Sequence, residues 1–290
     1  MQARYTTPTE IQNFLSANGL NAQKKFGQNF LIDQNIVRSI IDSARSILTS
    51  ESMEVAEIGI GLGTLTLPIL ELDLKTHLFE IDHAYIELAK NTYLKDFPKA
   101  TLYPGDALKN LEQIADRNVF VFGNLPYHLT SEILTYLAGE FLNWRGGLFM
   151  VQKEFAERLT GEISSLSVYL EAIGKTTLLR HVHKKCFFPV PKIDSSLILI
   201  TPTPQSERIF KSKEELLIWS RMLRSFFWGK RKQIQVSLRE SPFSQDTGFQ
   251  EAVTAAWEKI GISPKSRPEE LNRKQFLNLG QELLDSLSKR

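Results

Sequence analysis

The sequence contains a single cysteine, Cys186, among 290 residues. One cysteine can form neither an internal disulfide nor a cysteine-based zinc cage. No paired base is evident beside it, so we expect a buried thiol and not a nucleophile. Redox functions and structural zinc are therefore excluded, and we expect no metal site.

The chain also lacks long hydrophobic runs. No apolar run approaches the ~18 residues needed to span a bilayer, and the first eight residues lack the apolar core of a signal peptide. We therefore expect a soluble cytoplasmic protein without membrane contacts. Hydrophobic residues still make up 42% of the chain, which is enough to bury the core of one large or two ordinary domains.

Positive charge is concentrated in one part of the chain. Residues 180–240 hold 13 Lys and Arg against 5 Asp and Glu, a local charge of +8. The rest of the chain holds 22 Lys and Arg against 28 Asp and Glu. Such segregation is expected of a protein that binds a polyanion, although a solvated helical face would look similar. Aromatic residues adjoin the basic tracts 180–185 and Lys230-Arg231-Lys232, which favours binding to phosphates and unstacked bases.

From residue 54 onward, short apolar runs alternate with segments of helical period near 83–95, 130–140 and 153–160. This alternation is typical of a buried parallel sheet in an α/β fold. The last two runs are separated by little helix, which predicts an antiparallel hairpin at one sheet edge. We predict seven strands, near residues 55–58, 76–79, 101–103, 119–122, 148–151, 167–170 and 196–200.

The stretch Thr201-Pro202-Thr203-Pro204 cannot continue a central strand and is a natural linker. Beyond it, apolar residues recur at helical spacing from Leu216 to Leu223 and from Phe276 to Leu284. We therefore predict an α/β domain over residues 1–201 and a small helical domain over residues 205–290.

A glycine-rich turn with Gly59, Gly61 and Gly63 follows the first predicted strand. Glycines let a ligand approach the backbone, but the spacing differs from the dinucleotide fingerprint. Glu80 ends the second strand, where a carboxylate can accept hydrogen bonds from ribose hydroxyls. Asp106 follows the third, where it can accept from an adenine amine. Three strand ends with these residues predict a nucleoside-like cofactor, in preference to unrelated turns and helix caps.

The fourth strand ends in Asn124-Leu125-Pro126-Tyr127. An adenine amine is a poor nucleophile because its lone pair is delocalised into the ring. If the Asn124 side-chain oxygen and a nearby carbonyl accept its hydrogens, the nitrogen can pyramidalise and its lone pair can point at an electrophile. Pro126 fixes the direction of that carbonyl, and Tyr127 offers a flat face for a flipped base. A structural turn is the alternative, but the position after a strand favours the catalytic interpretation.

Six ordered motifs resemble those of the bacterial small-subunit rRNA adenine-N6 dimethyltransferases, the KsgA family. The resemblance covers residues 22–285 and implies a Rossmann-like class I methyltransferase sheet with a small C-terminal all-helical domain. It also implies S-adenosyl-L-methionine as the cofactor. The motifs are KKFGQNFL at 24–31, EIG at 57–59, FEID at 79–82, GDA at 105–107, GNLPY at 123–127 and FFPVPKIDS at 187–195.

The resemblance implies roles for individual cofactor-binding residues. Asn29 and Leu31 would close over the cofactor, and Gly59, with Gly61 in the same turn, would line its methionine side. Glu80 would hold the ribose. Composition alone does not assign a cofactor role to residues 28–31. It indicates only a polar, basic loop before a helix.

Further roles follow for the adenine and for the reaction. Asp106 would hold the cofactor's adenine, and Asn124 would contact both the cofactor and the target amine. Tyr127 would stack on one face of the target base, and Phe187 is our candidate for the opposite face.

The chain departs from the family pattern at three places. Ile60 replaces the usual proline after the first glycine, His128 replaces an asparagine that often follows the tyrosine, and Ser164-Ser165 replaces a Gly-Arg pair. None of these changes removes a group that the mechanism requires. Their effect on loop rigidity and on RNA contact stays open.

We predict that the protein uses S-adenosylmethionine to dimethylate N6 of two adjacent adenines in the 3′-terminal hairpin of 16S rRNA. We expect a monomer acting within an assembling small subunit late in its biogenesis. One alternative is a large-subunit rRNA adenine-N6 methyltransferase, which usually has isoleucine at Leu125. The other is an assembly factor that acts mainly by binding. A nicotinamide oxidoreductase is disfavoured by the position of Gly63. The exact nucleotides, the methylation order and the choice between naked rRNA and a particle stay open.

Overall fold

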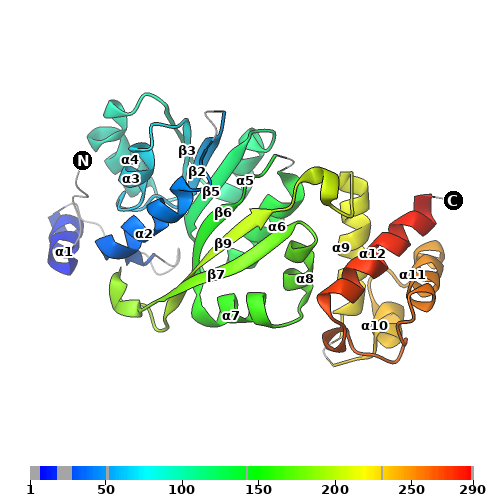
Figure 1. The fold of residues 1–290 in the computed structure, drawn as a ribbon. Coiled ribbons are helices and arrows are strands. Elements are labelled where there is room, and N and C mark those ends of the chain that lie inside the picture. The colour runs from blue at the N-terminus through cyan, green and yellow to red at the C-terminus, as the bar shows by residue number, and fades with distance from the viewer. Residues whose placement is uncertain (1–6, 18–27, 50–51, 142, 230, 289–290) are drawn as a thin grey trace. The chain divides into compact units, whose positions relative to one another are not determined.

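The computed structural model describes residues 7–17, 28–49, 52–141, 143–229 and 231–288 (Figure 1). The chain forms two compact units: residues 1–156 with 177–201, and residues 157–176 with 202–290. The second unit therefore includes residues 157–176, which the sequence analysis assigned to the first domain. Helix α8 (Ser165–Glu171) packs against α9 (Lys213–Phe226), and this contact accounts for the difference.

A seven-stranded sheet forms the centre of the first unit, with strand order β4-β3-β2-β5-β6-β9-β7. The five strands β4, β3, β2, β5 and β6 are parallel to one another. Strand β9 is antiparallel to β6. The prediction of a mostly parallel α/β sheet is confirmed. The strands are β2 (Glu54–Ile58), β3 (Thr76–Glu80), β4 (Ala100–Pro104), β5 (Val119–Asn124), β6 (Gly147–Gln152), β7 (Gly174–Val182) and β9 (Ser195–Pro202).

A second, two-stranded sheet joins segments that are far apart in the sequence. In it, β1 (Phe30–Leu31) is antiparallel to β8 (Phe187–Phe188), with Phe30 opposite Phe188 and Leu31 opposite Phe187. The backbone N–H of Ile32 also donates to the carbonyl of Cys186. The segment before the first long helix is therefore held against the FFPVP loop.

Helices cover both faces of the large sheet. Figure 1 shows α2 across the near face and α6 behind the sheet. The near-face core combines α2 and α3 side chains with strand residues such as Val55, Phe120 and Phe122. The helices of this part of the chain are α1 (Pro8–Ala17), α2 (Gln34–Arg45), α3 (Thr66–Leu70), α4 (His83–Thr92), α5 (Ala107–Asn110), α6 (Thr130–Glu140) and α7 (Lys153–Gly161).

Helix α2 illustrates how local sequence gives this packing. Asp33 caps its N-terminus, because its carboxylate accepts from the backbone N–H groups of Asn35 and Ile36. Its apolar residues recur every three or four positions and form one buried face against the sheet. That face consists of Ile36, Val37, Ile40, Ile41 and Ala44.

The predicted strand at residues 167–170 is wrong, because this segment is helix α8. Ser164 and Ser167 form a reciprocal capping box, in which each side chain accepts from the other residue's backbone N–H. Four consecutive residues from Ser167 to Leu170 are buried, so the apolar run alone does not distinguish a buried helix from a buried strand.

The seventh strand is β7, which the sequence analysis did not identify. It lies at the sheet edge beside β9, and most of its residues are partly or fully exposed. An exposed edge strand needs no apolar run, so it lacks the signal used to find the others. The basic residues Arg180 and His181 lie near its end.

Four longer helices build the second unit: α9, α10 (Ile234–Glu240), α11 (Thr247–Lys259) and α12 (Arg273–Ser288). Gly280 of α12 lies against Trp219 of α9, where a Cβ atom would come within 2.4 Å of the indole ring. Arg273 ties α12 to residues 157–176, donating to the Glu171 carboxylate at 2.9 Å and to the carbonyl of Thr160 at 3.0 Å.

Short 3-10 helices complete the secondary structure: η2 (Leu94–Asp96), η3 (Leu111–Ile114), η4 (Lys184–Cys186), η5 (Gln205–Glu207) and η6 (Pro268–Glu270). Within the described ranges, no helix has both the length and the apolar character required to cross a bilayer. In the same ranges, no three His, Cys, Asp or Glu side chains are grouped so that they could hold a metal ion.

Candidate active site

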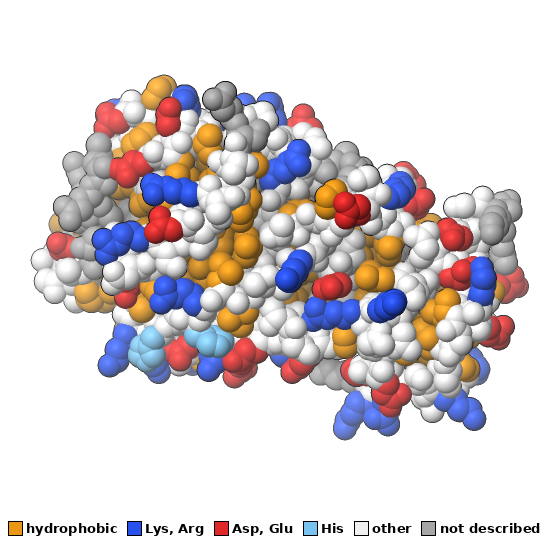
Figure 2. All heavy atoms as spheres, viewed as in Figure 1, with side chains coloured by type: hydrophobic (Ala, Val, Ile, Leu, Met, Phe, Trp, Pro, Cys, Tyr) orange, Lys and Arg blue, Asp and Glu red, His pale blue; other side chains and the backbone are white. Residues whose placement is uncertain are grey.

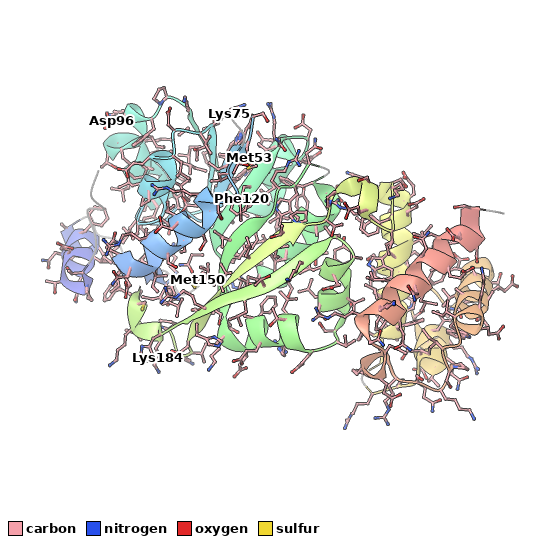
Figure 3. All side chains as sticks on the ribbon, viewed as in Figure 1. Met53, Lys75, Asp96, Phe120, Met150 and Lys184 are labelled. Carbon is pink, nitrogen blue, oxygen red and sulfur yellow. The ribbon has the colours of Figure 1, made fainter. Side chains whose placement is uncertain are left out.

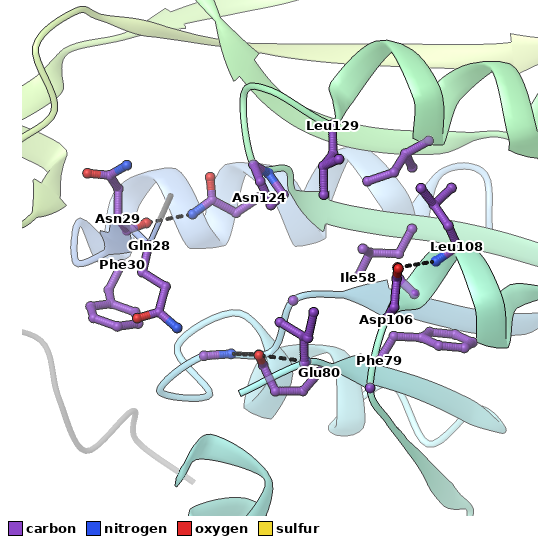
Figure 4. A pocket seen from close by; sticks show the side chains of 17 residues that line it. Gln28, Asn29, Phe30, Ile58, Phe79, Glu80, Asp106, Leu108, Asn124 and Leu129 are labelled. Carbon is purple, nitrogen blue, oxygen red and sulfur yellow. Dashed lines mark hydrogen bonds between the residues drawn. The ribbon is translucent and has the colours of Figure 1, made fainter. Parts of the chain in front are cut away.

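A pocket opens where β2, β3 and β5 end and where the turn after β4 leads into α5 (Figure 4). It contains about 770 Å³ of non-protein space, part of which is open to solvent. The structure brings together at this pocket most of the residues expected to bind the cofactor: Asn29, Gly59, Gly61, Glu80, Asp106 and Asn124.

The glycine-rich turn leaves room for a ligand. Gly59 and Gly61 have φ values of 82° and 50°, in the left-handed region that favours glycine. A Cβ atom placed on Gly59 would meet no protein atom within 4 Å. At Gly61 a Cβ would lie 3.2 Å from the ring of Phe30. The backbone at Gly59 is therefore open to the pocket, whereas Gly61 lies close against the residue 28–31 segment.

Glu80 is buried at the end of β3 and holds the surrounding loops in place. Its Oε2 accepts from Gly61 N at 2.9 Å, and its Oε1 accepts from Ile81 N at 2.9 Å and from Asp82 N at 2.8 Å. Burial raises the pKa of this carboxyl, while the backbone donors oppose the shift. Three N–H groups occupy most of the four or so acceptor positions that a carboxylate offers.

Asp106 and Asn124 have different fixed contacts. The Asp106 carboxylate caps α5 by accepting from Leu108 N at 3.0 Å. The Asn124 side-chain Nδ2 donates to the carbonyl of Asn29 at 2.7 Å, a bond between the end of β5 and the segment before α2 (Figure 4). This bond fixes the Asn124 amide, so that its oxygen is left as the acceptor.

Two other predicted residues, Leu31 and Tyr127, lie outside the main pocket. Leu31 is buried in the core and borders a smaller adjoining cavity, which also touches Gly59 and Asn124. Tyr127 is half-buried beyond Pro126, and its hydroxyl is 2.9 Å from the Oγ of Ser195. The Lys24-Lys25-Phe26-Gly27 part of the first motif lies outside the described residues.

Phe187 is not placed to stack on a base, contrary to our expectation. Its side chain is only 1% exposed and packs in the near-face core with Leu31, Val182 and Leu197. Both ring faces are therefore covered by protein. The partly exposed aromatic of this loop is Phe188, which packs against the cluster that includes Phe30, a pocket residue.

Several lining residues were missed by the sequence analysis. The pocket is also lined by Gln28, Phe30, Phe79 and Ile81, which lie within the motifs at 24–31 and 79–82 but were given no individual role. Ile81 is 48% exposed directly after Glu80, and this position next to a predicted site residue could have identified it.

Glu57 was also missed as an individual site residue. It is 2% exposed near the end of β2 and borders the smaller cavity. Among the described residues its Oε2 has no hydrogen-bond partner. Burial raises its pKa to about 8, and the nearby Glu80 carboxylate adds to the shift. A carboxyl immediately before a glycine-rich turn was a signal that could have found it.

Comparison with known proteins defines the relationship of this chain. The family described as "Ribosomal RNA adenine dimethylase" matches residues 19–285. The chain belongs to the ribosomal RNA adenine dimethylase family. Its sheet and helical region are those of a class I methyltransferase with a C-terminal helical part.

Two relatives of this dimethylase are named Ribosomal RNA small subunit methyltransferase A. The one from Leuconostoc mesenteroides is 31% identical, over 94% of this chain and 93% of its own length. The one from Clostridium botulinum Loch Maree is 34% identical, over 91% and 94% respectively. The relationship therefore extends through nearly the whole of each protein.

Solved structures give the same fold for the dimethylase. A dimethyladenosine transferase from Plasmodium falciparum has a TM-score of 0.68 at 24% identity and covers 88% of this chain and 97% of its own. The 23S rRNA methyltransferase ErmE has a TM-score of 0.63 at 25% identity and covers 88% and 99%.

The raised pKa of Glu57 predicts a pH-dependent stability. The unfolded chain loses this proton near the ordinary value of 4.5, whereas the folded protein keeps it up to about 8. The free energy of unfolding should therefore fall as pH rises through this window, by at most about 1.4 kcal/mol per pH unit. Glu57→Gln should remove this contribution, so the variant should gain stability relative to the parent as pH rises.

Urea unfolding of both proteins at about pH 5, 6.5 and 8 measures this difference. Glu80 is present in both proteins, so the difference reports Glu57 together with its interaction with Glu80. A stability difference that is constant across the three pH values would contradict the assignment.

Proposed function

We propose that this protein transfers methyl groups from S-adenosylmethionine to N6 of two adjacent adenines in the 3′-terminal hairpin of 16S rRNA, dimethylating each. The observation that carries the proposal is the position of Asn124-Leu125-Pro126-Tyr127 at the end of β5, across the pocket from Glu80 (Figure 4). The names of the relatives support the small subunit as the source of the RNA. We propose a cytoplasmic monomer that acts on rRNA within an assembling subunit.

The residues of the pocket fit the cofactor. Bound S-adenosylmethionine would supply the methyl group as an electrophile on a sulfonium centre. The open backbone at Gly59 would leave space for the methionine side, with Asn29 over it and Leu31 at the smaller adjoining cavity. The Asp106 carboxylate would accept from the adenine amine. Since Glu80 already accepts three N–H groups, we propose that its Oε2 takes one ribose hydroxyl instead of two.

The reacting amine would be oriented by Asn124 and by the carbonyl before Pro126. Because Asn124 Nδ2 donates to Asn29, its Oδ1 is free to accept one amine hydrogen. The Pro126 carbonyl already accepts from Leu129 N at 3.0 Å, so the carbonyl of Leu125 is our choice for the second hydrogen. With both hydrogens held, the lone pair points toward the methyl donor, and orientation lowers the barrier.

The basic tract near the end of β7 would contact RNA phosphates. Figure 2 shows His and Lys or Arg side chains together at the end of the first unit where Figure 3 labels Lys184. The backbone N–H of Lys184 donates to Asp194 Oδ1 at 2.9 Å, which fixes the loop while the lysine side chain is left to reach outward. Such contacts position RNA without reading its sequence.

Transfer of labelled methyl groups to immature small subunits, followed by mapping of the modified bases, tests the function. We expect dimethylation of two adjacent adenines near the 3′ end of 16S rRNA. Asn124→Ala should abolish most turnover and leave a folded protein, because the amine is no longer oriented. Comparison of subunits with naked 16S rRNA identifies the substrate form.

A large-subunit activity is the second candidate, because the structure resembles that of ErmE, a 23S rRNA methyltransferase. The same assay with 23S rRNA distinguishes the two. Methylation of 23S rRNA alone would replace the proposed function, and binding without transfer to either RNA would favour the assembly-factor alternative.

Loss of the Glu80 charge should weaken cofactor binding. A hydrogen bond to a charged group contributes roughly 1.5–3 kcal/mol, so Glu80→Gln should raise the Kd for S-adenosylmethionine at least about ten-fold. The matched control is Glu54→Gln, which neutralises a carboxylate at the opposite end of the neighbouring strand, where it contacts His77 and Lys75. Calorimetric titration that gives equal affinities for both folded variants would contradict the role of Glu80.

Charge removal in the second basic tract should weaken RNA binding in a salt-dependent way. The variant replaces Lys230, which lies outside the described residues, and Arg231 and Lys232 with Gln. Lys232 pairs with Glu240, so its contribution should be smaller than that of the exposed Arg231. Each lost phosphate contact should reduce the slope of log affinity against log salt by about 0.7–0.9.

RNA-binding isotherms of parent and variant at several salt concentrations measure the slopes, and cofactor titration serves as the control. Parallel lines with equal intercepts would show that this tract makes no RNA contact and is only a solvated part of the surface. Cofactor affinity should stay constant, because the tract lies in the second unit and the pocket is lined by the first.

A further inference from the structure

Ser195 is a fully buried residue with a direct bond to the reaction motif. Its side chain is 0% exposed at the start of β9, and it does not line the pocket. Its Oγ lies 2.9 Å from the hydroxyl of Tyr127, which is 68 residues away in the sequence. The resemblance includes Ser195 in a motif but assigns it no role.

The topology explains how this contact arises. Strand β9 is antiparallel to β6, so that its first residue, Ser195, pairs with Gln152, the last residue of β6. The beginning of β9 therefore lies at the same edge of the sheet as the ends of the parallel strands. Asn124 is the last residue of β5, and Tyr127 lies in the turn after it at this same edge. Strand β5 is the neighbour of β6 on the side away from β9.

The backbone at Ser195 is anchored from two sides. The carbonyl of the preceding Asp194 accepts from Lys153 N at 3.0 Å, and the Asp194 carboxylate accepts from Lys184 N at 2.9 Å. Residue 195 itself is paired with β6. Its hydroxyl is therefore a fixed point against which another side chain can be held.

The turn that carries Tyr127 is held by its backbone, and the Tyr127 hydroxyl is held by Ser195. Leu125 N donates to the carbonyl of Met150 at 3.2 Å, and Leu129 N donates to that of Pro126 at 3.0 Å, which hold the turn on either side. Two side-chain torsions set the place and the plane of the ring. A hydrogen bond to the hydroxyl fixes where the far end of the ring lies, and because a phenolic O–H prefers the ring plane, the bond also favours one orientation of that plane. Burial raises the pKa of the Tyr127 hydroxyl, so it stays protonated for this bond.

We infer that Ser195 is a positioning residue for methyl transfer, which holds the ring of Tyr127 in the orientation that stacks on the target adenine. This inference rests on the proposed function. Ser195 touches neither substrate nor cofactor and acts only through Tyr127. Its effect should therefore appear in the transfer step and not in cofactor binding.

A double-mutant cycle tests the inference. Ser195→Ala and Tyr127→Phe remove the same hydrogen bond from opposite ends, and a bond of this kind corresponds to about a five-fold change in rate. We expect each variant to lower the single-turnover rate of methyl transfer by about that factor. The double variant should be no slower than the slower single variant. The Kd for S-adenosylmethionine should match that of the parent.

The neighbouring Ser196→Ala is the matched control. Ser196 is also 0% exposed, but its Oγ bonds to His181 Nδ1 at 2.9 Å. We expect this variant to transfer methyl groups at the parental rate. If Ser195→Ala fails to fold, Tyr127→Phe still removes the bond from the half-buried side, and a parental rate in that variant would overturn the inference.

Fluorescence gives a second readout that a purely structural role would not change. The probe is the 3′-terminal 16S rRNA hairpin with 2-aminopurine at a target position, whose emission is quenched by stacking. We expect weaker quenching with Ser195→Ala than with the parent or with Ser196→Ala.

Further outcomes would count against the inference. A parental transfer rate in folded Ser195→Ala overturns it, and so do multiplicative losses in the double variant. Both of these results leave the proposed function intact. A parent protein that transfers no methyl group to 16S rRNA overturns the proposed function, and the inference with it.

Discussion

The common direction of the central strands is the constraint on which the site depends. Parallel strands end at one edge of a sheet, so β2, β3, β4 and β5 deliver their last residues to the same place. Glycine, carboxylate and amide groups from segments separated by dozens of residues therefore line one pocket. The reversed strand β9 adds its beginning to that edge, and with it Ser195 and the loop from residue 187 to 194.

Burial of polar groups is the cost of this arrangement. Glu80 is buried but satisfied by three backbone donors, so it both shapes the glycine-rich turn and keeps an acceptor position for a ligand. Glu57 lies behind the same turn with an unsatisfied oxygen and a pKa raised to about 8. Burial of two carboxyl groups lowers the free energy of unfolding relative to an apolar core of the same size, and buried ionisable groups of this kind are typical of functional sites.

Two hydrogen bonds link the reaction motif to distant segments. Asn124 is tied to Asn29, and Tyr127 is tied to Ser195. The β1–β8 pair then joins the segment of Asn29 to the FFPVP loop before Ser195. The segment expected over the cofactor and the loop expected near the target base are therefore held together by backbone pairing.

The sequence by itself determined the five parallel strands and several residues that line the pocket, because buried strands and glycine-rich turns leave local patterns. Gly59, Glu80, Asp106 and Asn124 could be named since each follows or ends an apolar run. Only the tertiary structure decided the state of residues 167–170, where serine capping selected a helix, and the position of Phe187, whose ring the core covers. It also decided the partners of Asn124 and Tyr127. Contacts across 95 and 68 residues depend on how strands pair, and that information is not local.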